Sequence, residues 1–430
     1  MVSSAARAHH ASSEPTRGMF PASVWLVAAA FAALTLYAQL RLATPDDAAS
    51  WWIAGRLVAT GHADALYAID PNDYGLFTGP EWTHEAELIA EHTLVPHPYV
   101  HLPSVAYILA PLTMIMSFPV FIALGAVITG VSLTLLAAAS IALWTDRAPR
   151  PGVLVAVTTL VWLSSAAQAS ITLGQTSPFI YALITLSVAL SRRRPWLAGA
   201  CIAVAAFIKI TPVAVVVAML LFASRRRAGL IATGLLASAG VMSYLLVPSS
   251  VFSAWRETVG WIGAHTLAPH NVAIDALLIM PVRTEAIVGV FAESSPWALP
   301  IKLLILVVLA VGALALMGSE STKKFEIIAV VMMLGATSIS SVLWVHYALM
   351  GAVGIIGVVA LYRWWWAVAF LLLLLPPFAA GEGELSWDLA PLVVLLGPSL
   401  VLLFGAVVAH RPSVAEIGRG LRREFMAARV

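Results

Sequence analysis

A chain of 430 residues that is 60% hydrophobic and only 11% charged differs from soluble domains, in which charged residues make up about a quarter. Its composition therefore excludes an ordinary soluble fold and indicates a multi-spanning membrane protein. The net charge of +2 comes from short basic clusters between apolar runs, a distribution that does not indicate nucleic-acid binding. The single cysteine, Cys201, excludes a disulfide framework and a cysteine metal site.

The chain begins with residues 1–18, whose polar composition predicts a disordered cytoplasmic tail. The apolar run at 19–42 is too long for the core of a signal peptide and lacks a convincing small-residue cleavage site. It therefore predicts the first transmembrane helix. Arg7 and Arg17 favour a cytoplasmic N-terminus, because cytoplasmic loops are enriched in Lys and Arg.

Two adjacent carboxylates, Asp46 and Asp47, come directly after this first span. Carboxylates at the end of a span are costly near lipid, which makes the pair a functional-site hypothesis. A solvated cap for the next helix, predicted to begin near Ala48, explains the pair as well. Of the two, Asp47 is the better candidate for a catalytic base.

The rest of the chain alternates between apolar runs and polar or basic turns. An acidic outer loop at 43–102 holds two predicted short helices, 48–60 and 81–92, and a half-inserted helix follows at 102–116. A second outer loop spans 248–300, and a basic cytoplasmic tail spans 411–430. In the rest of the chain up to the tail we predict nine further crossings, at 119–144, 152–167, 176–190, 228–247, 301–317, 325–343, 348–361, 367–380 and 389–408.

The stretch between two arginine triplets, 192–194 and 225–227, departs from this alternation. Its basic ends are both expected in the cytoplasm, yet the stretch is too short for two crossings of about 20 residues each. We predict a broken re-entrant hairpin with Lys209 near its tip, lining a cavity that satisfies the freed backbone groups. One long helix with a snorkelling Lys209 is the alternative.

The expected architecture is an all-α polytopic membrane protein, with one transmembrane domain over 19–410. It has about ten full crossings of roughly 20 residues each, plus the hairpin and the short outer-face helices. Both termini are cytoplasmic in this topology, and the unexplained polar residues gather at the outer face. They include Asp46, Asp47, His97, His101, Gln175, Asn271, Trp344, His346 and Tyr347.

Several short motifs carry a family resemblance. They are Asp47 past the first span, Trp51-Trp52, Ala54-Gly55, the turn at 61–67, His101-Leu102-Pro103, Ala110-Pro111-Leu112, Gly174-Gln175, the Lys-x-x-Pro at 209–212, and 344–347. In order and spacing they resemble the polyprenol-phosphate-sugar-dependent transferases of glycosyltransferase family 87, which have the GT-C membrane fold. Ser177 stands where the family has Asn, and Tyr347 where it has a second His.

The resemblance implies a mannosyltransferase that uses polyprenyl-phosphate mannose to extend a lipid-anchored glycan, such as a phosphatidylinositol mannoside or related lipoglycan of actinobacteria. The α-1,2 linkage would form by inversion at the extracytoplasmic face of the plasma membrane. Relatives that use a decaprenyl-phosphate arabinofuranose donor are the alternative within the family. We expect a monomer that acts without a metal or other cofactor, since no metal-ligand spacing is visible.

The roles of the candidate residues follow from an inverting displacement, which needs one base for the acceptor hydroxyl. Asp47 is the expected base, Asp46 its possible substitute, and His346 a second catalytic candidate. Charge-assisted bonds would hold the donor phosphate, and the expected residues for this role are Lys209, Arg256, Lys302 and His101. Gln175, Asn271, Trp344 and Tyr347 are expected to contact the sugar or acceptor.

A transporter or flippase of a lipid-linked sugar would also need a broken hairpin and a polar cavity. Transporters often contain two similar halves, but the Asp-Asp, Gly-Gln and Lys-x-x-Pro stretches do not recur in the second half of this chain. The clustering of polar residues at one face also favours an enzyme.

Overall fold

The computed structural model describes residues 20–70, 73–77, 79–89, 97–268, 271–279, 290–362, 364–375 and 388–426. Within these ranges the fold is almost entirely helical, apart from two short antiparallel strand pairs, β1–β2 and β3–β4. The prediction of an all-α polytopic membrane protein is confirmed. The predicted tail at 1–18 lies outside the described residues.

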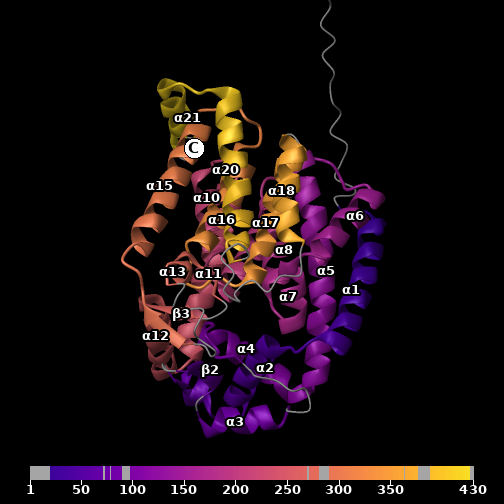
Figure 1. Ribbon diagram of the computed structural model, residues 1–430, viewed down its shortest axis with the longest axis vertical. Helices are drawn as coiled ribbons and strands as arrows, with labels where there is room; N and C mark the ends of the chain where they lie inside the picture. Colours follow the sequence, from indigo (N-terminus) through magenta and orange to yellow (C-terminus); the bar gives the residue numbers. More distant parts are fainter. Residues whose placement is uncertain are drawn as a thin grey trace, which may run out of the picture.

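Four helices lie together at one end of the molecule, the lower end in Figure 1, and we call them the cap layer. They are α2 (Asp46–Ala59), α3 (Pro80–Glu87), α4 (Pro103–Ile115) and α12 (Ser249–Ala264). The same two stretches of chain contribute η1 (Ala63–Tyr67), β1 (Ile69–Asp70), β2 (Asp73–Phe77), β3 (His265–Ala268), α13 (Ile274–Leu277) and β4 (Val290–Glu293). The two predicted outer loops, together with the predicted half-inserted helix at 102–116, thus supply the cap layer.

The cap layer has its own apolar core, formed by Trp52, Leu66, Trp82, Tyr99 and neighbouring side chains. Close packing of α2 on α4 depends on Gly55, where an added Cβ would lie only 2.8 Å from the Thr113 side chain. This contact explains the Ala-Gly pair in α2. It holds the α2 helix, and with it Asp47, in a fixed place at this end of the bundle.

Five described helices are long and apolar enough to cross a membrane. They are α1 (Ala22–Leu42), α5 (Phe118–Thr145), α11 (Arg226–Leu246), α15 (Ala298–Met317) and α20 (Ala390–His410). The remaining bundle helices are shorter: α6 (Pro151–Trp162), α7 (Ser165–Leu173), α8 (Ser177–Leu190), α9 (Pro195–Ile208), α10 (Val213–Leu221), α16 (Lys324–Ser338), η3 (Val345–Met350), α17 (Gly351–Leu361) and α18 (Trp364–Leu374).

The total number of crossings stays a prediction, since shorter helices can also contribute to spans. The predicted helix at 152–167 is two helices, α6 and α7, bent by 66°. Ser164 causes the break, since its hydroxyl accepts a hydrogen bond from the Ala167 N–H at 3.2 Å and caps the new helix α7. Counting this bent pair as one span brings the number of candidate spans to six.

The predicted re-entrant hairpin is confirmed. Gly199, near the start of α9, packs against Ile231 of α11, and Gly229 of α11 packs against Leu220, near the end of α10. The start of α9 and the end of α10 therefore lie at the same level of α11, so the two helices run in opposite directions. Lys209 lies in the turn between them, where α9 has just ended.

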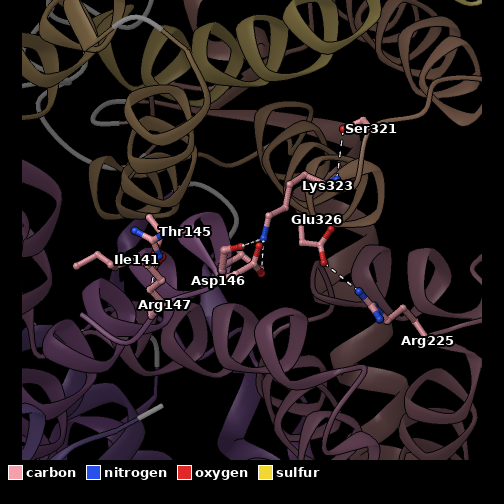
Figure 2. A network of polar contacts seen from close by, with 9 residues as sticks. Ile141, Thr145, Asp146, Arg147, Arg225, Ser321, Lys323 and Glu326 are labelled. Atoms are coloured by element: carbon pink, nitrogen blue, oxygen red, sulfur yellow. Dashed lines mark hydrogen bonds and ion pairs between the residues drawn. The ribbon is translucent and has the colours of Figure 1, made fainter. Parts of the chain in front are cut away.

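The opposite end of the bundle is joined by a buried ion pair and by a second pair whose carboxylate is exposed (Figure 2). Lys323 binds the Asp146 carboxylate at 2.7 Å, and Arg225 binds Glu326 at 2.9 Å. The tail predicted at 411–430 contains the helix α21 (Val414–Met426), whose Glu424 carboxylate accepts a hydrogen bond from the Ala223 N–H at 2.9 Å. Figure 1 shows α21 and the C-terminus at this upper end, away from the cap layer.

Candidate functional site

The N-terminus of α2 presents Asp47. Both Asp46 and Asp47 lie in its first turn, where a carboxylate interacts favourably with the helix dipole. The Asp47 carboxylate accepts a hydrogen bond from the Gln175 side-chain amide. Burial raises the pKa of Asp47, and the nearby His97 and the Gln175 hydrogen bond oppose that rise. A carboxylate with a raised pKa is a stronger proton acceptor when ionised, as general-base catalysis requires.

Gly174 brings Gln175 to this carboxylate. It ends α7 in the left-handed conformation, with φ +68°, which glycine adopts without steric cost. An added Cβ would lie 2.7 Å from the Ala48 side chain, one residue beyond Asp47. The Gly-Gln motif therefore has a physical reason: the glycine allows close approach to α2, and the glutamine then meets Asp47.

The irregular segment 97–102 runs along the same face of α2. Its main-chain carbonyls are bound by side chains, which is how buried backbone outside regular structure is satisfied. Tyr67 donates to the His101 carbonyl at 2.6 Å and Tyr99 to the Leu102 carbonyl at 2.9 Å. Ser50 donates to the His97 carbonyl, and Trp255 donates to the Val100 carbonyl at 3.4 Å. Four hydrogen bonds to its main-chain carbonyls thus fix the path of this segment.

His101 joins the cap layer to the hairpin. Its ring lies 4.4 Å from the Trp51 ring and hydrogen-bonds to the Ile208 backbone at the end of α9. Burial, with the nearby Lys209, lowers the pKa of His101 to about 4, although the hydrogen bond to the Ile208 backbone opposes this shift. The imidazole is therefore neutral near pH 7, so its predicted contact with a phosphate would be made without a positive charge.

Lys209 meets the segment that contains the late Trp-Val-His-Tyr motif. Its ammonium lies 2.9 Å from the centroid of the Tyr347 ring, a cation–π arrangement. His346, only 2% exposed, has its ring 4.6 Å from the Tyr347 ring. Lys209 forms no ion pair with a carboxylate in the part of the chain that the structure describes. Its positive charge is therefore available to an anionic ligand.

Electrostatic contacts connect these groups into one site. Asp47 interacts with His97 and Tyr347, and Lys209 interacts with His101 and His346. The structure thus brings together six residues predicted from the sequence: Asp47, His101, Gln175, Lys209, His346 and Tyr347. It combines a proton acceptor with a nearby cation.

Asn271 and Lys302 are placed differently. The fully buried Asn271 amide donates to the Ser341 carbonyl at 3.0 Å and accepts from the Leu343 N–H at 2.9 Å and the Ala273 N–H at 3.0 Å. Lys302 is ion-paired with Asp275. We call these contacts the clasp. It fixes the chain just before His346 and Tyr347, and the predicted substrate contacts of Asn271 and Lys302 stay predictions.

Arg256 and Trp344 lie at the margins of this arrangement. Arg256 is on the exposed face of α12, where its guanidinium donates to the Ser253 hydroxyl at 3.4 Å. The Trp344 carbonyl accepts the Tyr347 N–H at 2.9 Å and so starts η3. The described contacts do not bring either side chain to Asp47 or Lys209, and their predicted substrate roles stay predictions.

Three further residues belong to the site and had no assigned role: His97, Trp51 and Tyr181. His97 interacts with both Asp47 and His346, and Tyr181 interacts with Tyr347. Trp51 lies four residues after Asp47 on α2, hence on the same helix face. That spacing was visible in the sequence, whereas the positions of His97 and Tyr181 depend on contacts between distant segments.

In the described ranges, no three His, Cys, Asp or Glu side chains group as metal ligands. The expectation of a metal-independent reaction stays a prediction.

Comparison with known proteins adds a family to this geometry. The model of glycosyltransferase family 87 matches residues 99–341, more than half of the chain. No curated protein matches the chain significantly. The matched range includes His101, Gln175 and Lys209, and it ends shortly before His346.

Proposed function

Because the chain belongs to glycosyltransferase family 87, and is therefore a membrane glycosyltransferase, we propose that it moves mannose from polyprenyl-phosphate mannose to a lipid-anchored glycan. The acceptor class we propose is a phosphatidylinositol mannoside or related lipoglycan, extended by an α-1,2 linkage. The observation that supports a transferase most directly is Asp47, hydrogen-bonded by Gln175 and close to the Tyr347 ring over which Lys209 lies.

In the proposed reaction, the acceptor hydroxyl oxygen attacks the anomeric carbon as the bond to the phosphate oxygen breaks. The electron pair leaves with the polyprenyl phosphate, and the hydroxyl proton passes to the Asp47 carboxylate. Inversion turns a β-linked donor into an α-linked product, and phosphate leaves without a proton near neutral pH. No metal or other cofactor takes part in this scheme.

Lys209 stabilises the negative charge that develops on the leaving phosphate. A preorganised cation in a site that excludes water is worth more than the same cation in bulk solvent. Near neutral pH an uncharged His101 leaves Lys209 as the cation for this task, with His346 orienting the sugar or phosphate. Gln175 holds the Asp47 carboxylate in its orientation.

The proposed location is the plasma membrane, with both termini in the cytoplasm and the site at the extracytoplasmic face. The support is the distribution of charge: Arg192 to Arg194 and Arg225 lie at the end of the bundle opposite the cap layer, and cytoplasmic ends are enriched in such residues. We propose that the monomer is the active unit, because Asp47, Gln175 and Lys209 all come from one chain.

The test is transfer of labelled mannose from synthetic polyprenyl-phosphate mannose to a phosphatidylinositol mannoside by purified protein in detergent, with a chelator in every tube. Wild type and Asp46→Ala should form product and Asp47→Ala should not. Product that forms only from an arabinofuranosyl donor would refute the mannose assignment within the family. Absence of transfer in detergent, together with movement of the lipid-linked sugar across sealed vesicles, would establish a flippase instead.

A further inference from the structure

Tyr181 is a buried residue with an unused polar group. Its side chain is 1% exposed and packs in the main apolar core, on the second turn of α8. The hydroxyl has no hydrogen-bond partner among the residues that the structure describes. Ser177 lies close by, one turn earlier on α8, but the two hydroxyls do not meet with hydrogen-bond geometry.

A buried hydroxyl without a partner is unusual, because leaving it unsatisfied costs its full desolvation free energy. Thr158, on α6, has a similarly unpartnered hydroxyl, but a threonine can turn to the carbonyl four residues back in its own helix. A tyrosine cannot do this, since its hydroxyl lies at the end of a rigid ring. The Tyr181 hydroxyl therefore needs a partner from elsewhere.

Its position points to the substrate as that partner. Tyr181 interacts electrostatically with Tyr347, and the Lys209 ammonium lies over the Tyr347 ring. Tyr347 in turn interacts with Asp47. A second unpartnered hydroxyl, that of Thr211, lies two residues after Lys209 in the hairpin turn. One unused hydroxyl is thus linked to Lys209 through Tyr347, and the other lies next to Lys209 along the chain.

We infer that the Tyr181 hydroxyl donates a hydrogen bond to a phosphate oxygen held beside Lys209, and that Thr211 supplies a second donor. Phosphate oxygens accept strong hydrogen bonds from neutral and charged donors. A tyrosine hydroxyl adds a donor without adding a second buried positive charge, which would be costly in this apolar place. The chemistry fits a phosphate monoester or diester, and the proposed function identifies it with the polyprenyl phosphate of the donor.

Tyr181→Phe tests this inference, because it removes the hydroxyl and keeps the ring in the core. Tyr362→Phe is the matched control, since the Tyr362 hydroxyl already donates to the Leu402 carbonyl at 3.0 Å. Ligand-induced shifts in Tm would be measured with a short-chain polyprenyl phosphate and, separately, with inorganic phosphate. The two probes distinguish a lipid headgroup from free phosphate as the source.

We expect Tyr181→Phe to keep or raise the Tm of the free protein and to weaken binding of polyprenyl phosphate by about 10- to 100-fold. Tyr362→Phe should lower the Tm and leave the affinity unchanged. Thr211→Val gives an independent reading, with an expected loss of about 3- to 10-fold. If Tyr181→Phe and Thr211→Val bind both probes as tightly as wild type, the inference is wrong.

This result is separable from the proposed function. Wild-type protein that transfers no sugar from any polyprenyl-phosphate donor, yet binds a phosphate probe through Tyr181, refutes the function and supports the inference. If the wild-type protein transfers mannose and Tyr181→Phe keeps the same KM for the donor, the result supports the proposed function and refutes the inference.

Discussion

At the scale of single residues, Asp47 combines two demands that oppose each other. Burial raises its pKa, which makes the carboxylate a better base, but the ionised form is then costly for the folded protein. A raised native pKa means that the native state binds the proton more tightly than the unfolded chain does. Stability is therefore lost as pH rises from the pKa of the unfolded chain, for which the ordinary aspartate value is 3.8, through the native pKa.

Asp47→Asn should therefore separate activity from stability. We expect transfer to fall by about 10²- to 10⁴-fold, the range for loss of a general base, while the Tm at pH 7 rises by about 1–4 °C. Below the unfolded pKa of the aspartate, the two proteins should have the same Tm. Thermal melts from pH 3 to pH 8 check the second point, with Asp46→Asn as control.

The pH profile of transfer gives a second reading of the same residue. In the wild type, activity should rise with pH as Asp47 ionises, and the residual activity of Asp47→Asn should lack that rise. An Asp47→Asn protein with lower Tm than wild type at pH 7 would contradict the desolvation account. It would show instead that the negative charge stabilises the α2 N-terminus.

At the scale of elements, the turn between α7 and α8 is the most exacting connection in the site. Gly174 needs the left-handed conformation and also a space too small for a methyl group beside Ala48. Each demand alone excludes most residues, and their combination explains why a glycine precedes Gln175.

Gly174→Ala should lower the Tm and reduce transfer by at least about 10-fold, because the turn must move away from α2 and take Gln175 with it. The conformational cost alone is about 1–2 kcal/mol. Gly125→Ala in α5 is the control, since an added Cβ there meets open space and alanine favours helix. Equal activity in Gly174→Ala and Gly125→Ala would show that the Gln175 hydrogen bond is dispensable.

Some of these elements could be predicted from the sequence and others could not. The hairpin followed from arginine triplets at both of its ends, and its tip at Lys209 followed from the Lys-x-x-Pro stretch. The break between α6 and α7 was missed. Ser164 is a good N-cap residue, but it lies within a long apolar run that predicts a single helix. Apolar length alone also did not show where a run divides into two helices, as 152–167 does.

Some side chains of the site could likewise be predicted from the sequence, and others could not. Asp47, Gln175, Lys209 and His346 were predicted together, because family motifs and their expected side of the membrane agreed. The clasp was not foreseen, since the carbonyl that Asn271 binds belongs to Ser341, seventy residues later. A sequence shows that a buried asparagine needs partners, but it does not show that they are backbone groups.

At the scale of the whole molecule, the two ends of the bundle have different tasks. The cap layer and the short helices meet at the proposed catalytic site, and the other end is joined by ion pairs (Figure 2). The 28 residues of α5 span about 42 Å between them. Changes at the Arg225–Glu326 pair should therefore affect folding more than chemistry.

Glu326→Gln tests this separation. It leaves the guanidinium of Arg225, a residue only 9% exposed, without its carboxylate, a change that costs about 3–5 kcal/mol for buried pairs. We expect a lower Tm and a smaller folded yield, with kcat per folded molecule within about twofold of wild type. The double variant Arg225→Met/Glu326→Leu should recover the Tm, and a selective loss of kcat would show that the two ends are coupled.

The way in which residues 97–102 are held has a consequence for divergence among relatives. The four bonds that fix this segment are made to main-chain carbonyls, and three of their donors, Ser50, Tyr67 and Trp255, lie outside it. Exchanging the side chains of His97 or His101 leaves those bonds intact. We expect the path of the chain to persist in relatives in which these two side chains differ, so that a new substrate preference arises here without a new fold.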